Sequence, residues 1–212
     1  APESEIKLAT SPTPLAVTLA QDYPEVASTV RLEASPQVIK TNNNLSKEDN
    51  FYKADQNIFS IFDFDFVEGS ATGALQNPNS IVIDQTMAKK YFGDEPALGK
   101  TLVCGEEVLK VTAVVKDRPA NSDLHIDALL SSDFTEEPGW MDDFSLYTYV
   151  LFKNIPDLKV FEDKLVALSA KYVQPELDAQ GAVDYKVHFE LEPLAEVHFS
   201  QGKVQDTPKG NK

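Results

Sequence analysis

The segment from Gly93 to Thr101, GDEPALGKT, comes closest to a nucleotide-binding pattern. A P-loop offers backbone N–H groups to phosphate, and a helix N-terminus follows its Lys-Thr pair. Here five residues separate the two glycines where the motif has four, and the local pattern predicts helix, loop and strand in that order. Glu95 and Pro96 also bring a negative charge and a missing N–H to the loop. We therefore predict that this turn binds no nucleotide.

The three histidines, His125, His188 and His198, are too scattered along the chain to indicate a zinc site. His188 and Glu190 match the first half of a zinc-deaminase signature, but the cysteine pair that completes it is missing. Both residues would lie on the same side of a strand. A solvated surface pair is therefore the expected arrangement.

The acidic residues and Cys104 give no clearer chemistry. Asp63, Asp65 and Glu68 suggest calcium, yet an EF-hand loop needs glycine at its sixth position, where Glu68 stands. Cys104 is the single cysteine, and we expect a small buried strand residue there. With 34 acids, a carboxylate pair for glycoside hydrolysis stays open, because the fold sets its separation. We predict no catalytic, cofactor-binding or metal-binding residue, and no cofactor.

Composition narrows the class of protein. The 212 residues carry a formal net charge of −15, which repels nucleic acid, so no nucleic-acid partner is expected. No run approaches the roughly 18–20 consecutive apolar residues of a membrane span. A hydrophobic content of 42% and twelve phenylalanines can supply a globular core.

Both ends of the chain predict a helix with strands. Near the start, the pattern predicts a helix over 14–22, strands over 28–32 and 37–40, and a loop over 41–50. Near the end, it predicts strands over 145–153 and 183–191. Between those two strands an amphipathic helix begins at Pro156 and Asp157. Its apolar face comprises Leu158, Phe161, Leu165, Leu168 and Tyr172.

The middle of the chain differs from both ends in its pattern of predicted elements. Ile81 to Ile83 predict a strand, Asp84 caps the following helix, and Gly93 ends it. Residues 100–103 and 108–117 predict a hairpin, and the low hydropathy of 133–143 indicates a boundary. The two ends would bury their helix-covered faces best by pairing, which makes the middle an insertion.

Several segments in order resemble the periplasmic core domain of MacB-like ABC permeases of the MacB/FtsX type. The resemblance covers about Thr13 to Ser200, and its most specific piece is NSIVIDQTMAKKYFGDEPALGKTL. In this family Gly93 to Thr101 corresponds to an FGD-x-P-x-GK turn between a helix and a strand. The other matching segments are TPLAVTLAQDYPEVASTVRL, YKADQNIFSIFDFDFVEGSATGAL, KVTAVVKDRPANSDLHIDALLSS, LYTYVLFK and EPLAEVHFS.

The resemblance implies an α+β fold with a discontinuous arrangement. Residues 1–55 and 140–203 would form a porter-like subdomain from both chain ends. Residues 56–139 would form a small, β-rich, Sabre-like subdomain inserted into it. Residues 204–212 would be a polar tail leading toward the next transmembrane helix.

The implied function is a non-catalytic domain on the extracytoplasmic (periplasmic) side of the bacterial inner membrane, anchored by flanking transmembrane helices absent from this chain. It would transmit ATPase-driven motion to a substrate or periplasmic partner protein in efflux or export. A cognate ABC ATPase and a permease dimer are the implied partners. Two alternatives stay open: a free-standing secreted binding or adhesion module, and a carboxylate-based hydrolase.

Overall fold

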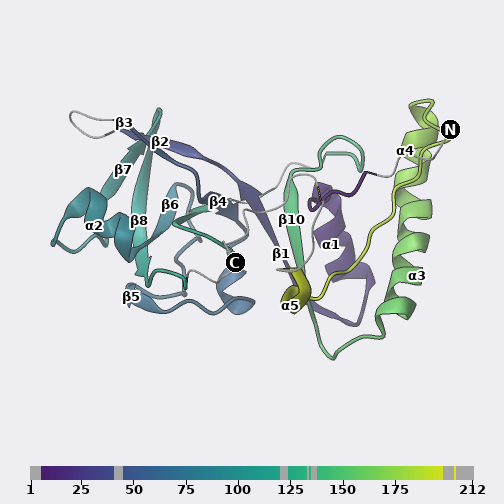
Figure 1. Cartoon of the computed structure of the whole chain (residues 1–212), viewed down its shortest axis with the longest axis horizontal. Coiled ribbons are helices and arrows are strands. Elements are labelled where there is room, and N and C mark those ends of the chain that lie inside the picture. The colour runs from purple at the N-terminus through teal and green to yellow at the C-terminus, as the bar shows by residue number, and fades with distance from the viewer. Residues whose placement is uncertain are drawn as a thin grey trace. The chain divides into compact units, whose positions relative to one another are not determined.

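The computed structural model describes residues 6–40, 45–119, 124–132, 134, 138–197 and 203. These residues form two compact units (Figure 1). Unit 1 holds the described residues of 6–29 and 138–203, and unit 2 holds those of 30–134. The fold class is α+β, as the family resemblance implies, and the strands form a large mixed sheet. No helix in the described part of the chain is both long and apolar enough to cross a bilayer.

Unit 1 contains two main helices beside a short piece of sheet. The predicted N-terminal helix is α1 (Thr13–Asp22), and the predicted amphipathic helix is α3 (Leu158–Leu168). The Asp157 carboxylate caps α3 by accepting the Val160 N–H at 3.2 Å. The remaining elements are β10 (Leu146–Phe152), the first residues of β1 (Val26–Ala34), η2 (Ser169–Val173), α4 (Gln174–Ala179) and α5 (Leu194–Val197).

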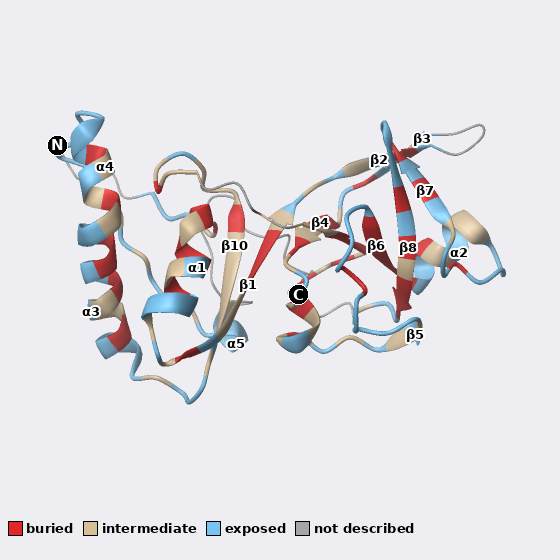
Figure 2. Ribbon diagram, turned by 180° about the vertical axis from the view of Figure 1, so that it is seen from behind, coloured by how far each residue is buried: buried red, intermediate tan, exposed pale blue. Residues whose placement is uncertain are grey.

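The core of unit 1 lies between these helices and the strands. Figure 2 shows the buried residues of α3 along the side that faces α1. The Phe161 ring packs edge-on against Phe152 at 4.9 Å and tilted against Tyr23 at 5.5 Å, measured between ring centroids. The buried members of this core are Leu15, Leu19, Val26, Trp140, Phe161, Leu165, Leu168, Val173 and Leu177.

The helix that begins as α3 continues past Leu168 through the π-helical turn η2 into α4. Pro175 lies in the first turn of α4 and has no N–H to donate. The π-helical turn η2 comes directly before this proline. A regular α-helix would lose a backbone hydrogen bond at Pro175, because proline has no N–H.

Unit 2 is built on a mixed sheet. From β1 onward the hydrogen-bonded order is β1-β4-β9-β6-β8-β7-β2-β3, and β5 pairs with β8. The β4–β9 and β6–β8 pairs are parallel, whereas the other described pairs are antiparallel. The strands are β2 (Gln37–Lys40), β3 (Leu45–Glu48), β4 (Phe51–Ala54), β5 (Phe66–Glu68), β6 (Ser80–Asp84), β7 (Thr101–Cys104), β8 (Glu107–Val115) and β9 (Ala128–Ser131).

The helix α2 (Gln85–Phe92) covers one face of this sheet, and η1 (Ile58–Ser60) is a short 3-10 turn after β4. Met87 of α2 is buried against apolar residues of β2, β6, β7 and β8. The Gly93 backbone has φ 68°, a left-handed conformation that suits glycine at a helix end. The predicted strand-helix unit and the predicted β7–β8 hairpin are both confirmed.

Two sequence-based predictions of local structure are wrong. The segment 183–191 forms no strand: Val187, Phe189 and Leu191 pack on the core of unit 1 without a strand partner. Its alternation therefore reflects one-sided packing alone. The predicted loop over 41–50 contains β3 at Leu45–Glu48, although residues 41–44 lie outside the described residues.

Arg31 and Asp55 form a mostly buried ion pair where β1 meets the end of β4. The guanidinium donates to both carboxylate oxygens, from Nε at 2.9 Å and from Nη2 at 2.8 Å. The Arg31 backbone N–H donates to the same carboxylate at 2.8 Å, and the Arg31 carbonyl accepts the Asp55 N–H at 3.2 Å. Bidentate geometry of this kind is the strongest form of an ion pair.

We expect Arg31→Met to lower the free energy of unfolding by about 3 kcal/mol, because it leaves the Asp55 charge without its partner. Lys53→Met is the matched control: Lys53 pairs with Glu33 at 3.3 Å, but its side chain is 44% exposed. This control should cost less than about 1 kcal/mol. Urea unfolding measures both variants, and equal losses would contradict the assigned role of the buried pair.

Candidate functional site

The turn between α2 and β7, which contains the P-loop-like sequence, already binds a carboxylate of the protein itself. The Glu68 carboxylate of β5 accepts the backbone N–H groups of Ala97 and Leu98 at 3.3 and 2.8 Å. A phosphate bound at this turn would need the same donors. The structure therefore gives the turn a structural role, in which Glu68 fastens it to the sheet.

A group of carboxylates surrounds the first turn of α2. The Asp84 carboxylate accepts the Met87 N–H at 2.7 Å. The Asp117 carboxylate accepts the N–H and the hydroxyl of Thr86 at 2.9 and 2.7 Å. Burial raises the pKa of Asp84 to about 6, and the charges of Asp117 and Asp127 add to this against the Met87 bond. These acids cap a helix rather than stand free as an acid–base pair.

The remaining chemically suggestive residues are dispersed or enclosed. His188 and Glu190 are both exposed, as the surface interpretation predicts, and His198 lies outside the described residues. Cys104 is buried in β7, and burial followed by the charge of Glu107 raises the pKa of its thiol to about 11. Within the described ranges, no group of three or more His, Cys, Asp or Glu is arranged to hold a metal ion.

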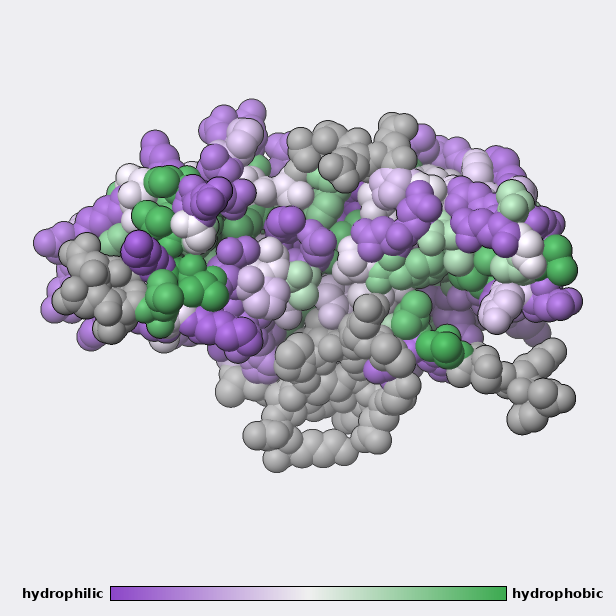
Figure 3. Space-filling view, turned by 90° about the horizontal axis from the view of Figure 1, so that it is seen from above, coloured by the Kyte–Doolittle hydropathy of each residue, from purple (hydrophilic) through white to green (hydrophobic). Residues whose placement is uncertain are grey.

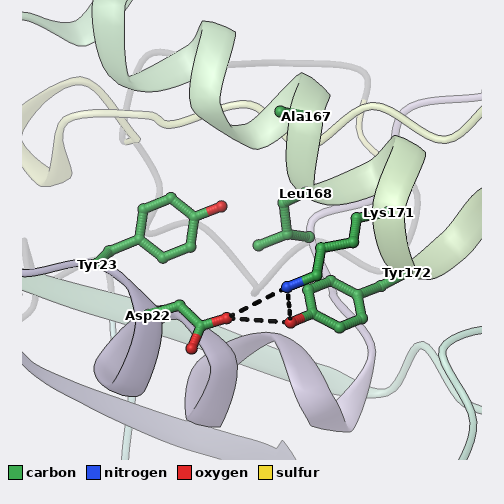
Figure 4. Close-up of a pocket in the computed structure, with 6 residues that line it drawn as sticks. All are labelled: Asp22, Tyr23, Ala167, Leu168, Lys171 and Tyr172. Carbon is green, nitrogen blue, oxygen red and sulfur yellow. Dashed lines mark hydrogen bonds and ion pairs between the residues drawn. The ribbon is translucent and has the colours of Figure 1, made fainter.

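Unit 1 carries an open hollow of about 440 Å³ between the end of α1 and the end of α3 (Figure 4). The Tyr172 hydroxyl donates to the Asp22 carboxylate at 3.0 Å, and the Lys171 ammonium donates to that hydroxyl at 2.5 Å. Lys171 and Asp22 lie 4.0 Å apart. Tyr23, Ala167 and Leu168 complete the lining.

The polar groups of this hollow are paired with one another. The hydrogen bond to Tyr172 raises the pKa of Lys171, so its ammonium stays charged near neutral pH and does not serve as a base. Burial raises the pKa of Tyr23, whose hydroxyl donates to the Lys164 carbonyl at 3.3 Å.

The loop of residues 139–141 packs against Tyr172, which lines this hollow. The Trp140 ring stacks on Tyr172 with centroids 5.2 Å apart and an interplanar angle of 15°. The Glu176 carboxylate of α4 accepts the backbone N–H groups of Trp140 and Met141 at 3.0 and 3.1 Å. A Cβ at Gly139 would lie 2.9 Å from carboxylate oxygens of Asp142 and Glu176, so a larger residue there would displace these carboxylates.

Sequence reasoning missed this site because its parts are far apart along the chain. Asp22 and Tyr172 are separated by 150 positions. The sequence pattern puts Tyr172 on the apolar face of a helix, and the low hydropathy around Trp140 indicates only a boundary. The single tryptophan inside an acidic segment is the one sequence feature that indicates this site, because a large ring of this kind is mostly buried against other parts of the fold.

The chain matches a known protein family over most of its length. The model of the MacB-like periplasmic core domain matches residues 4–168. The chain belongs to this family. In this MacB-like domain, the α2–β7 turn held by Glu68 lies inside the matched range. No curated protein sequence matches the chain.

Solved structures share its fold. A domain described as part of a permease protein from Porphyromonas gingivalis has a TM-score of 0.66 at 19% identity, covering 78% of this chain and 79% of that chain. The periplasmic region of MacB from Actinobacillus actinomycetemcomitans has a TM-score of 0.56 at 17% identity, with 87% and 80% covered. The extracellular domain of the ABC-type transporter YknZ from Gram-positive bacteria has a TM-score of 0.57 at 16% identity, with 82% and 86% covered.

The Asp84 carboxyl predicts a specific pH dependence. Because its folded pKa of about 6 lies above the ordinary value of 3.8, the folded state binds more protons between these pH values. The contribution of Asp84 to stability therefore falls as pH rises from about 4 to about 6. Asp84→Asn keeps a good N-cap residue but removes the titration.

We expect the midpoint temperature of Asp84→Asn, relative to the parent chain, to rise between pH 4 and pH 6 and then to level off. Thermal melts at several pH values measure this difference, in which the other carboxyl groups cancel. Asp65→Asn, at an exposed acid paired with Lys116 at 3.1 Å, is the control and should show no such rise. A pH-independent difference for Asp84→Asn would contradict the buried, charged cap.

The occupied turn at Ala97 and Leu98 predicts that the purified chain binds no ATP. Isothermal titration calorimetry with ATP should give no saturable heat, because Glu68 holds the donors and would repel phosphate. Saturable binding would overturn the structural role of this turn.

Proposed function

We propose that this chain is the non-catalytic, extracytoplasmic part of a bacterial ABC permease, and that it passes ATPase-driven motion to a substrate or partner protein in export. The observation that carries the proposal is membership of the MacB-like periplasmic core domain family over residues 4–168. Its location would be the periplasmic face of the inner membrane, with transmembrane helices flanking the chain.

The contacts inside each unit support a mechanical role. In unit 1, the Trp140 loop, α4 and α1 are tied through Glu176, Tyr172 and Asp22. In unit 2, the Arg31–Asp55 pair and the Glu68 bonds fix strands and turn. Units held in this way move as bodies, since packed cores do not deform continuously.

The state of the reactive groups supports a role without catalysis. The Asp84 carboxylate is used as a helix cap, the Cys104 thiol is buried with a raised pKa, and Lys171 is held charged by its neighbours. Acid–base chemistry would need the Asp84 carboxylate to be free of the Met87 N–H, whereas nucleophilic or base chemistry would need lowered pKa values for Cys104 and Lys171. The proposed partners are a cognate ABC ATPase, reached through the membrane part, a second permease copy and a periplasmic protein or substrate.

Replacement of residues 13–197 by a flexible linker within the parent permease tests this function. We expect the shortened permease to reach the membrane and to retain ATP hydrolysis with its ATPase, because the domain contributes no residue to the nucleotide site. It should not restore the phenotype of a strain that lacks the permease.

Three measurements decide the outcome: the amount of permease in the membrane fraction, its ATPase rate and complementation of the strain. Glu106→Gln in the intact permease is the control, since this exposed turn residue has no described contact and should leave all three unchanged. Full complementation by the shortened permease would contradict the proposal.

A further inference from the structure

The face of the β3-β2-β7-β8 sheet that points away from α2 combines lysines with aliphatic side chains. On the α2 side these strands present buried residues such as Ile39, Leu102 and Leu109. On the opposite side they present eight outward positions, here called the lysine face. These are Val38, Lys40, Leu45, Lys47, Thr101, Val103, Val108 and Lys110.

Strand register makes this face continuous. Lys40 lies opposite Leu45 on one side and Val103 on the other, and Val103 lies opposite Val108. One cross-strand row therefore runs through four neighbouring strands. The aliphatic members are well exposed: Leu45 by 72%, Val108 by 52%, Val38 by 45% and Val103 by 38%.

Farther along β8 the same side of the sheet is covered, which sets the lysine face apart. Beyond Lys110, the Thr112 hydroxyl donates to the Ala74 carbonyl at 2.6 Å, and Ala74 and Leu75 are buried there. The described part of the chain lays no such segment over Val103 and Val108. In Figure 3 the end of unit 2 near β2, β3 and β7 shows apolar and polar side chains interleaved.

The lysine face carries positive charge, whereas the chain as a whole carries negative charge. None of its eight positions carries an acid, although the chain has 34 acids against 19 lysines and arginines. Among the described residues, the ammonium groups of Lys40 and Lys110 have no ion-pair partner, while Lys47 pairs with Asp49 at 2.5 Å. Glu107 lies opposite Cys104, whose side chain points to the α2 side.

We propose that the lysine face docks a short acidic segment of a partner protein, with apolar side chains on the aliphatic row and carboxylates on Lys40 and Lys110. This rests on the proposed function, since it names the chemistry of the periplasmic partner. Lysine stems pack along apolar side chains while their ammonium groups pair with carboxylates, so one amphipathic segment uses both features.

The observations favour this occupant over two others. A second copy docked on the same face through a two-fold axis would bring its lysines against these lysines. An anionic bilayer would attract the lysines but would repel a chain of net charge −15. A short segment stays within about one Debye length of the lysines, so the acids farther away oppose it less.

A synthetic helical peptide of about 15 residues, in which glutamates flank the leucines on the same face, serves as the probe. Its control replaces every glutamate by lysine. Calorimetry gives the affinity, and backbone amide shifts of the isotope-labelled chain locate the binding. We expect the glutamate peptide to bind, to shift amides of β2, β3, β7 and β8, and to weaken as salt is raised.

Variants separate the charge from the aliphatic contribution. Lys40→Glu with Lys110→Glu should weaken peptide binding at least about tenfold, whereas Lys159→Glu on exposed α3 should not change it. Val108→Ser should weaken binding severalfold, while Val160→Ser, at a valine 55% exposed on α3, should have no effect. Thermal melts confirm that each variant is folded.

Four outcomes would overturn the proposal: no binding of the glutamate peptide, equal binding of the lysine peptide, amide shifts outside the lysine face, or unchanged affinity in the double lysine variant. Lysine-dependent binding to vesicles of phosphatidylglycerol, or lysine-dependent dimerisation in sedimentation, without peptide binding, would replace the partner segment by a membrane or a second copy. None of these outcomes alters the result of the linker replacement, so the transport role is judged separately.

Discussion

The buried ion pair between Arg31 and Asp55 sets the register on which the sheet of unit 2 depends. Two charges can be removed from water only if each finds the other with good geometry, and here both side chains and both backbones take part. A slip of β1 by one residue would turn Arg31 to the opposite face of the sheet and leave the Asp55 carboxylate without its ion-pair partner. The register of β1 with β4, and through β4 the parallel pairing with β9, follows from this constraint.

Elements whose causes are local were predictable from the sequence. Asp84 and Met87 are three residues apart, and Gly93 ends the helix by its own backbone freedom, so the β6–α2 unit is encoded within a short window. The same holds for α1, for α3 with its Asp157 cap, and for the β7–β8 hairpin. The family resemblance depended on these same segments, which is why it and the fold class could be identified together.

Elements whose causes lie elsewhere in the fold were not predictable. The residues of β3, Leu-Ser-Lys-Glu, have a polar sequence typical of a loop, yet Glu48 is buried where it accepts hydrogen bonds from Lys90 and Tyr91 of α2. In 183–191 the reverse holds, because alternating packing against unit 1 imitates a strand that has no partner. The hollow near Tyr172 was missed for the same reason, since its polar contacts join α1 to the helix after α3.

The residue types that suggested chemistry in the sequence are used by the fold itself. Glu68 occupies the backbone donors of the P-loop-like turn, Asp84 and Asp117 occupy the first N–H groups of α2, and Asp22 holds Tyr172. In a chain with a large excess of acids, pairing carboxylates with backbone N–H groups satisfies both without requiring a cation for each. Some described lysines therefore have no carboxylate partner, and the sheet register places two of them, Lys40 and Lys110, beside exposed aliphatic side chains.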